Sequence, residues 1–132
     1  MDLGPQKSIT LLNIQSVKSN TGLNVTKGAP VFVDWDSGVA LASAVTAASK
    51  AHPVWYGTDK ADSQFVGKIP VIVDGGYPFF TDQYNTGSTF ALGDPITAKS
   101  GKWDLAGSGD PVVGYVVKTP GTDSVLGFFY HG

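Results

Sequence analysis

Short runs of β-branched and aromatic residues, each bounded by turn residues, constrain the fold of this chain more than any other feature. Seventeen glycines and eight prolines among 132 residues punctuate the backbone throughout, which is typical of strands joined by turns. The clearest runs lie at residues 31–35, 70–73, 95–99, 111–118 and 125–130. This pattern predicts an all-β protein, a small single-domain barrel or sandwich of short antiparallel strands.

Two segments fit this pattern less clearly. Residues 39–51 are rich in alanine, and their apolar positions follow neither the helical nor the strand period, so 39–50 could hold a single short helix. The first twenty residues begin polar and then alternate loosely from Ser8 to Val17, which predicts an N-terminal arm over 1–20. Because the composition does not shift further along the chain, we expect one β domain over 21–132.

The side chains that enzymes use most are nearly absent. The sequence contains no cysteine, arginine or glutamate, and its histidines are His52 and His131. These absences exclude disulfides, thiolate chemistry, cysteine zinc sites and bidentate arginine clamps on phosphate. A net charge of −2 argues against nucleic acid and against an anionic membrane surface as partners. We therefore expect a binding protein, not an enzyme, with no cofactor.

No segment has the character of a targeting signal or a membrane anchor. Residues 1–7 lack the apolar stretch that a signal peptide needs after a basic start. No run approaches the ~20 apolar residues that a membrane-spanning helix needs. The sequence thus predicts no membrane partner.

The candidate metal and catalytic patterns each have a simpler interpretation. Residues 34–38 read Asp-Trp-Asp-Ser-Gly, which resembles the opening of a calcium loop, but such a loop ends in a glutamate that this chain lacks. Aspartate is also favoured in turns, so we interpret 34–38 as a turn after a strand. His52 has no cysteine or nucleophile elbow to work with, and most aspartates lie in turn signals. We expect no catalytic residue and no metal site.

A weak internal repeat relates the two halves of the chain. Residues 28–42 and 93–106 share the order Gly-x-Pro, a strand, Ser-Gly, and a strand ending in Leu-Ala. Proline fixes φ at the start of each strand and Ser-Gly supplies a tight reversal, so each unit predicts a hairpin. A second proline-led apolar run follows each unit, at 53–56 and at 111–117. Both a duplication and a coincidence of common turn motifs would produce this pattern.

The second unit resembles a known family. Gly93-Asp94-Pro95-Ile96-Thr97, then Ser100-Gly101-Lys102, then the run from Gly109 through Pro111-Val112-Val113-Gly114-Tyr115-Val116, is similar to segments of the capsid decoration (cement) proteins of tailed phages. The resemblance covers residues 90–132 best and 27–57 faintly. It implies a non-enzymatic virion structural protein that binds the outside of an assembled phage capsid and stabilises it.

This resemblance also implies partners and a location. The major capsid protein of a phage would be the partner, and a homotrimer would match the local three-fold axes of the lattice. The arm over 1–20 would add a strand to a free sheet edge of the capsid protein. The protein would be made in the host cytoplasm and would reside on the capsid surface of the virion. The alternatives are another virion component, such as a head fibre, tail tube or baseplate part, and a carbohydrate-binding β module.

Aromatic residues supply the candidate contact sites. Neighbouring side chains of a strand point to opposite faces, so Phe79 and Phe80 cannot both enter one core, and neither can Phe128 and Phe129. Either both faces are covered within the chain, or one member of each pair lies at an interface with another subunit. Stacking of a sugar on an exposed tryptophan is a further alternative. The candidate interface residues are Phe79, Phe80, Phe128, Phe129, Tyr130, Trp35 and Trp55.

Overall fold

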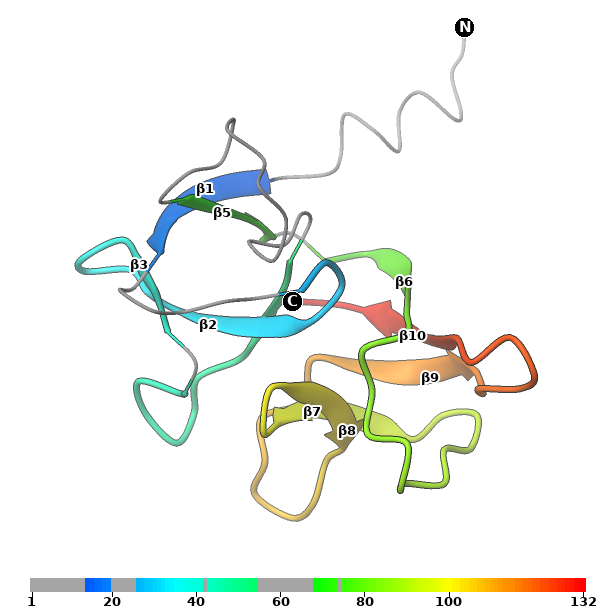
Figure 1. Ribbon diagram of the computed structural model, residues 1–132. Helices are drawn as coiled ribbons and strands as arrows, with labels where there is room; N and C mark the ends of the chain where they lie inside the picture. Colours follow the sequence, from blue (N-terminus) through cyan, green and yellow to red (C-terminus); the bar gives the residue numbers. More distant parts are fainter. Residues whose placement is uncertain (1–13, 20–25, 42, 55–67, 74) are drawn as a thin grey trace, which may run out of the picture.

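The structure, a computed structural model, describes residues 14–19, 26–41, 43–54, 68–73 and 75–132. Within these residues the chain forms ten strands and no helix, which confirms the all-β prediction (Figure 1). The first sheet has the order β4-β2-β3-β1-β5 and the second has the order β6-β10-β9-β7-β8. The strands are β1 Ile14–Ser19, β2 Pro30–Asp34, β3 Val39–Leu41, β4 His52–Pro53, β5 Lys68–Ile72, β6 Tyr77–Thr81, β7 Pro95–Lys99, β8 Lys102–Leu105, β9 Gly114–Lys118 and β10 Leu126–Tyr130.

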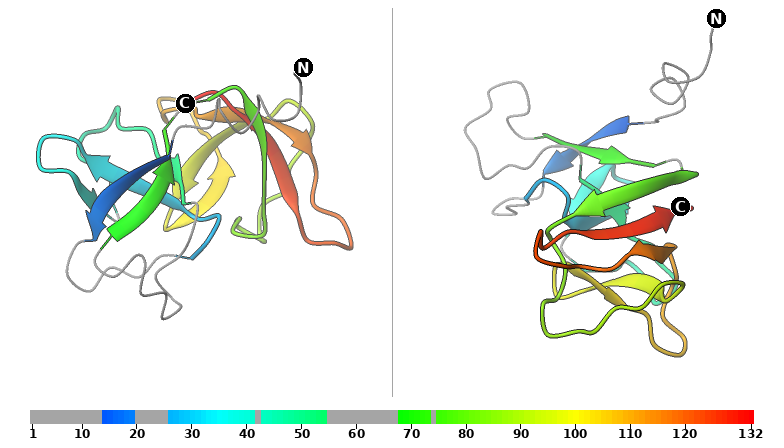
Figure 2. Two further views of the ribbon diagram at one scale, coloured as in Figure 1. Left: turned by 90° about the horizontal axis from the view of Figure 1, so that it is seen from above. Right: turned by 90° about the vertical axis from the view of Figure 1, so that its right-hand side faces the viewer.

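Each sheet closes on itself through one isolated bridge. In the first sheet, Val54 next to β4 pairs antiparallel with Val71 of β5. In the second sheet, Tyr84, which follows β6, pairs parallel with Trp103 of β8. The two end strands of each sheet therefore meet, and the chain folds as two five-stranded barrels that lie side by side (Figure 2). We call β1–β5 the first barrel and β6–β10 the second barrel.

The two barrels have the same topology. Around the first barrel the strands follow the order β1-β5-β4-β2-β3, and around the second they follow β6-β10-β9-β7-β8. The single parallel contact also recurs, because β1 pairs parallel with β3 and the segment after β6 pairs parallel with β8. The hairpins β2–β3 and β7–β8, which come from the two units of the sequence repeat, occupy equivalent places. The repeat is therefore a structural one, and it extends to all five strands.

The backbone hydrogen bonds at the start of each hairpin match one by one. Gly28 N–H donates to Val54 O (2.9 Å), and Val54 N–H donates to Ala29 O (3.0 Å). In the second barrel, Gly93 N–H donates to Val116 O (2.8 Å), and Val116 N–H donates to Asp94 O (2.9 Å). Both glycines adopt a left-handed conformation, with φ of 87° and 86°. The glycine of each Gly-x-Pro motif is favoured here because residues with a Cβ rarely adopt this φ.

The apolar residues form two clusters. Inside the first barrel, small β-branched residues from β2 and β5 pack with neighbours from β3 and the end of β4: Val31, Val33, Ala40, Val54 and Val71. The larger cluster fills the second barrel around Trp103 and Phe128. Ala51 and Ile72 of the first barrel join this larger cluster, and Phe32 packs against it. The larger cluster therefore contains residues of both barrels, which together form one domain.

Two side-chain hydrogen bonds to one backbone carbonyl help to hold the barrels together. Gly28 O accepts a hydrogen bond from Trp103 Nε1 (2.7 Å) and another from Thr81 Oγ1 (2.9 Å). The three residues are buried, so both bonds are shielded from water. A hydrogen bond is more costly to lose where no water can replace it, and this junction therefore fixes how the barrels sit on each other.

The structure describes parts of the two segments that fitted the strand pattern less clearly. The alanine-rich segment is not helical in its described residues: Val39–Leu41 forms β3, and residues 43–50 form bends and turns. The tight turn at Ser37-Gly38 folds the chain back along β2, and cross-strand pairing outweighs the high helix propensity of alanine. The predicted arm over 1–20 includes β1, which pairs with both β3 and β5 and so belongs to the first barrel. Residues 1–13 and 20 lie outside the described residues.

Candidate functional site

An exposed apolar face lies on the outside of the second barrel. It consists of Phe80 of β6, Phe129 of β10, and Tyr115 and Val117 of β9, which are 54%, 41%, 48% and 46% exposed. The three strands are adjacent, with β10 in the middle, and Phe129 pairs directly with Tyr115. We call these four residues the aromatic face. Large exposed apolar side chains grouped in this way on a soluble domain usually mark a contact surface.

The aromatic face is held in place by a glycine. Gly127 is the cross-strand partner of Phe80, and the Phe80 ring lies over it. A Cβ at Gly127 would come within 2.7 Å of Phe80 Cε1 and within 2.9 Å of Lys118 Cβ. The bare backbone therefore gives the ring a flat seat against the sheet. A side chain fixed in this way loses little rotamer freedom on binding, so the Phe80 ring of the face is preorganised for contact.

The structure separates the members of each phenylalanine pair, as strand geometry requires. Phe80 and Phe129 are exposed, whereas Phe128 is fully buried and Phe79 is half-buried against Trp103 and Phe128, with ring centroids 6.4 and 5.7 Å away. Tyr130 is 1% exposed. Phe128 and Tyr130 are therefore core residues and drop out of the candidate contact set.

The aromatic face also contains residues that the sequence analysis missed. Tyr115 and Val117 flank the buried Val116 on the strand run 114–118, so the period of two already places them on the opposite side from the core. Applying the phenylalanine argument to this run would have identified both. The predicted candidate Trp55 lies outside the described residues.

Trp35, the remaining candidate, belongs to the first barrel. It is 53% exposed in the β2–β3 turn, and its ring meets His52 edge-on with the centroids 5.6 Å apart. His52 Nδ1 is hydrogen-bonded to Tyr130 Oη (3.1 Å), and Tyr130 Oη donates to Ile72 O (3.3 Å). His52 thus lies between an exposed tryptophan and the junction of the two barrels.

The position of His52 makes stability depend on pH. Burial lowers the pKa of His52 below its ordinary value of 6.5, and a hydrogen bond with the backbone of Ile72 opposes this only in part. The unfolded chain therefore takes up the proton more readily than the folded protein. We expect the stability that neutral His52 contributes to be fully present above about pH 6.5 and to be lost progressively as the pH falls toward the lowered pKa.

The measurement is the urea midpoint at several pH values between 5 and 7.5. His52→Gln should flatten the decline over this window, because glutamine does not titrate. An unchanged slope in the variant would assign the decline to other groups.

The turn at 34–38 and the acid Asp104 have structural roles. Asp34 Oδ1 accepts a hydrogen bond from Asp36 N–H (3.1 Å) and Asp34 O accepts one from Gly38 N–H (2.7 Å), as in a hairpin turn. Asp104 is buried, and its carboxylate accepts hydrogen bonds from Ser88 Oγ and Asn85 Nδ2. Burial raises the pKa of Asp104, but these bonds and that from Leu105 N–H together hold it below its ordinary value.

Among the residues that the structure describes, no three histidine or acidic side chains lie together as a metal site would require. Within the same part of the chain, no helix is long and apolar enough to cross a membrane. No family model matches this chain, and neither a curated protein nor a solved structure matches it.

Proposed function

We propose that this chain is a non-enzymatic virion structural protein that binds the outside of an assembled phage capsid and stabilises it. The observation that supports this proposal most directly is the aromatic face, an exposed apolar surface on a closed barrel in which Phe80 is seated on Gly127. The sequence resemblance of residues 90–132 to capsid decoration proteins favours the same function. In this proposal the major capsid protein is the partner, and three copies gather at a local three-fold axis of the lattice.

The size of the aromatic face suits a protein that binds a lattice many times over. With about 200 Å² for a full aromatic side chain, its four residues expose on the order of 350 Å². Each partner in a standard stable interface buries about 800 Å². One such contact is therefore weak, and several contacts made at once on a lattice would sum to a stable attachment.

A partner could add a strand to the described part of this chain only at an open sheet edge. Both barrels are closed by bridges, so the described strands offer little free edge to a partner. The remaining route is the predicted one, in which the arm donates a strand to an edge of the capsid protein. In this proposal residues 1–13, which precede β1, would donate the strand.

Removing residues 1–13 is expected to abolish capsid binding while leaving the domain folded, because the truncated chain keeps all of β1. The measurement is co-sedimentation with heads of the encoding phage from which the protein has been removed. Circular dichroism of the truncated chain provides the folding control. Full binding by the truncated protein would reject the arm mechanism, and absence of binding by the intact protein would reject the capsid proposal.

A carbohydrate-binding module is the alternative that a specific observation favours. Tyr115 and Phe129 are cross-strand neighbours with exposed rings, and such pairs can stack on sugar rings. Glycan affinity that disappears in Tyr115→Ala, in a protein that does not bind capsids, would replace the virion proposal with this one.

A further inference from the structure

The two barrels of the chain meet through a defined face of the first barrel. Val54 and Val71 point into the first barrel, so their neighbours Pro53 and Ile72 point outward. Both outward residues are nevertheless buried, Ile72 in the apolar cluster that fills the second barrel. Ile72 O also accepts the hydrogen bond from Tyr130 of the second barrel. The outer surface of β4 and β5 is thus the docking face of the first barrel.

The equivalent face of the second barrel is uncovered. Pro53 pairs with Pro30 in the first barrel, and Tyr115 pairs with Pro95 in the second, so Tyr115 stands where Pro53 stands. Phe129 pairs with Tyr115 and is therefore the counterpart of Ile72. Tyr115 and Phe129 are 48% and 41% exposed. A position that the first barrel buries against its neighbour is open, apolar and aromatic in the second.

The surface of the second barrel that lies opposite the docking face also has an equivalent, in the first barrel. Pro30, which pairs with Pro53, and Phe32 also point outward from the first barrel, because Val31 and Val33 point inward. Together with Ser43 and Ala44 they line a pocket of about 310 Å³ whose other wall is Ala98 and the β7–β8 turn at Ser100-Gly101. The equivalent turn of the first barrel is the β2–β3 turn, which carries Trp35. Trp35 of this turn is 53% exposed, and its ring meets that of His52 in the same barrel.

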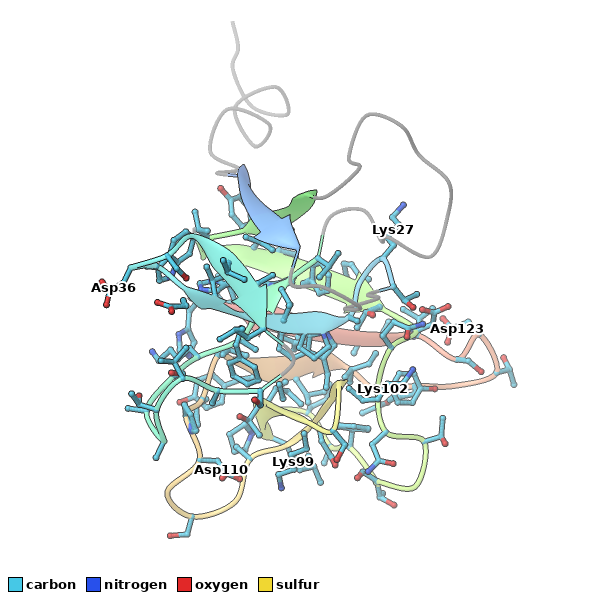
Figure 3. All side chains as sticks on the ribbon, turned by 60° about the vertical axis from the view of Figure 1, so that its left-hand side comes forward. Lys27, Asp36, Lys99, Lys102, Asp110 and Asp123 are labelled. Atoms are coloured by element: carbon cyan, nitrogen blue, oxygen red, sulfur yellow. The ribbon has the colours of Figure 1, made fainter. Side chains whose placement is uncertain are left out.

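Both surfaces stay exposed within one chain, so neither covers the other. Figure 3 shows Asp36 of the β2–β3 turn at an outer edge of the molecule. A contact between the aromatic face and the Trp35 turn therefore requires two copies. Because the two surfaces differ, such a contact is of the head-to-tail kind.

We propose that copies of this chain associate head to tail, the aromatic face of one copy taking the β2–β3 turn of the next copy's first barrel and so repeating the packing of the two barrels within each chain. Trp35 of the second copy would cover Tyr115 and Phe129, and Phe80 and Val117 of the aromatic face would stay open for the capsid contact of the proposed function. Head-to-tail contacts close into rings when the rotation allows and otherwise continue as filaments. The expectation that three copies close the ring depends on the proposed function, whereas the pairwise contact does not depend on it.

The test is sedimentation velocity of the full chain over a hundredfold concentration range. The wild-type mass should rise with concentration above 13.8 kDa. Phe129→Asp and Trp35→Asp should each remain monomeric, since each destroys one of the two surfaces. An equimolar mixture of these variants should form a dimer and nothing larger, because only one intact aromatic face and one intact turn can meet.

Controls keep the outcomes distinct. Leu92→Asp changes another exposed apolar residue, at 70% exposure, and should associate like the wild type. Tyr115→Asp repeats the test of the aromatic face if Phe129→Asp does not fold. A wild type that stays monomeric, or variants that do not complement each other, would overturn head-to-tail association. If the wild type is monomeric but binds capsids, head-to-tail association is rejected and the proposed function is kept. If the wild type associates but does not bind capsids, the proposed function is rejected and head-to-tail association is kept.

Discussion

Replacing Trp103 with alanine is expected to lower the free energy of unfolding by about 4 kcal/mol. Trp103 is fully buried, and its ring lies 4.9 Å from that of Phe128, centroid to centroid. Its Nε1–H also donates to Gly28 O across the junction of the barrels. Alanine would leave a large cavity in the main core and remove one of the two bonds at the junction. Urea unfolding followed by circular dichroism measures the loss.

The other substitutions at tryptophan give this result its meaning. Trp103→Phe keeps an aromatic ring but loses the N–H donor, and it should cost clearly less than Trp103→Ala. Trp35→Ala removes the same side chain from an exposed turn, where surface substitutions change stability by about 0.5 kcal/mol. Similar losses in Trp103→Ala and Trp35→Ala would show that burial and the junction bond contribute little at Trp103.

Local sequence patterns predicted the hairpins of this fold well. Gly-x-Pro and Ser-Gly mark both ends of β2 and of β7, and the return strands β3 and β8 follow directly. The argument that neighbouring phenylalanines point to opposite faces also holds at Phe128 and Phe129, of which the first is buried and the second exposed. These features depend on residues close together in the chain, so a short window of sequence contains the information.

The closure of the barrels could not be predicted in the same way. It depends on pairings between distant residues, such as Val54 with Val71 and Tyr84 with Trp103, and no local pattern specifies them. The identity of the docking face also depends on closure, because Ile72 and Phe129 are both apolar strand residues in the sequence. Only the topology shows that they are counterparts, and only the packing shows that Ile72 is buried while Phe129 is exposed.

Gly28→Ala is the second substitution with a large expected effect. The left-handed conformation of Gly28 alone costs an alanine about 1–2 kcal/mol. In addition, the new Cβ would lie 2.8 Å from Thr81 Oγ1, a contact that real Cβ atoms do not make. Thr81 cannot move aside freely, because its hydroxyl donates to Gly28 O and accepts from Gln83 N–H. We expect the total loss of unfolding free energy to exceed about 3 kcal/mol, with overpacking supplying the remainder.

Gly93→Ala is the matched control, since Gly93 occupies the equivalent place in the second barrel with a φ of 86°. A Cβ there meets no atom within 4 Å, so only the conformational cost remains, about 1–2 kcal/mol. The difference between the two variants in urea unfolding therefore isolates the contact of Gly28 with Thr81. A clear excess for Gly28→Ala would show that the junction fixes the two barrels against each other. Equal losses would mean that the barrels can shift to accept a methyl group, and the junction would then contribute little to holding the domain together.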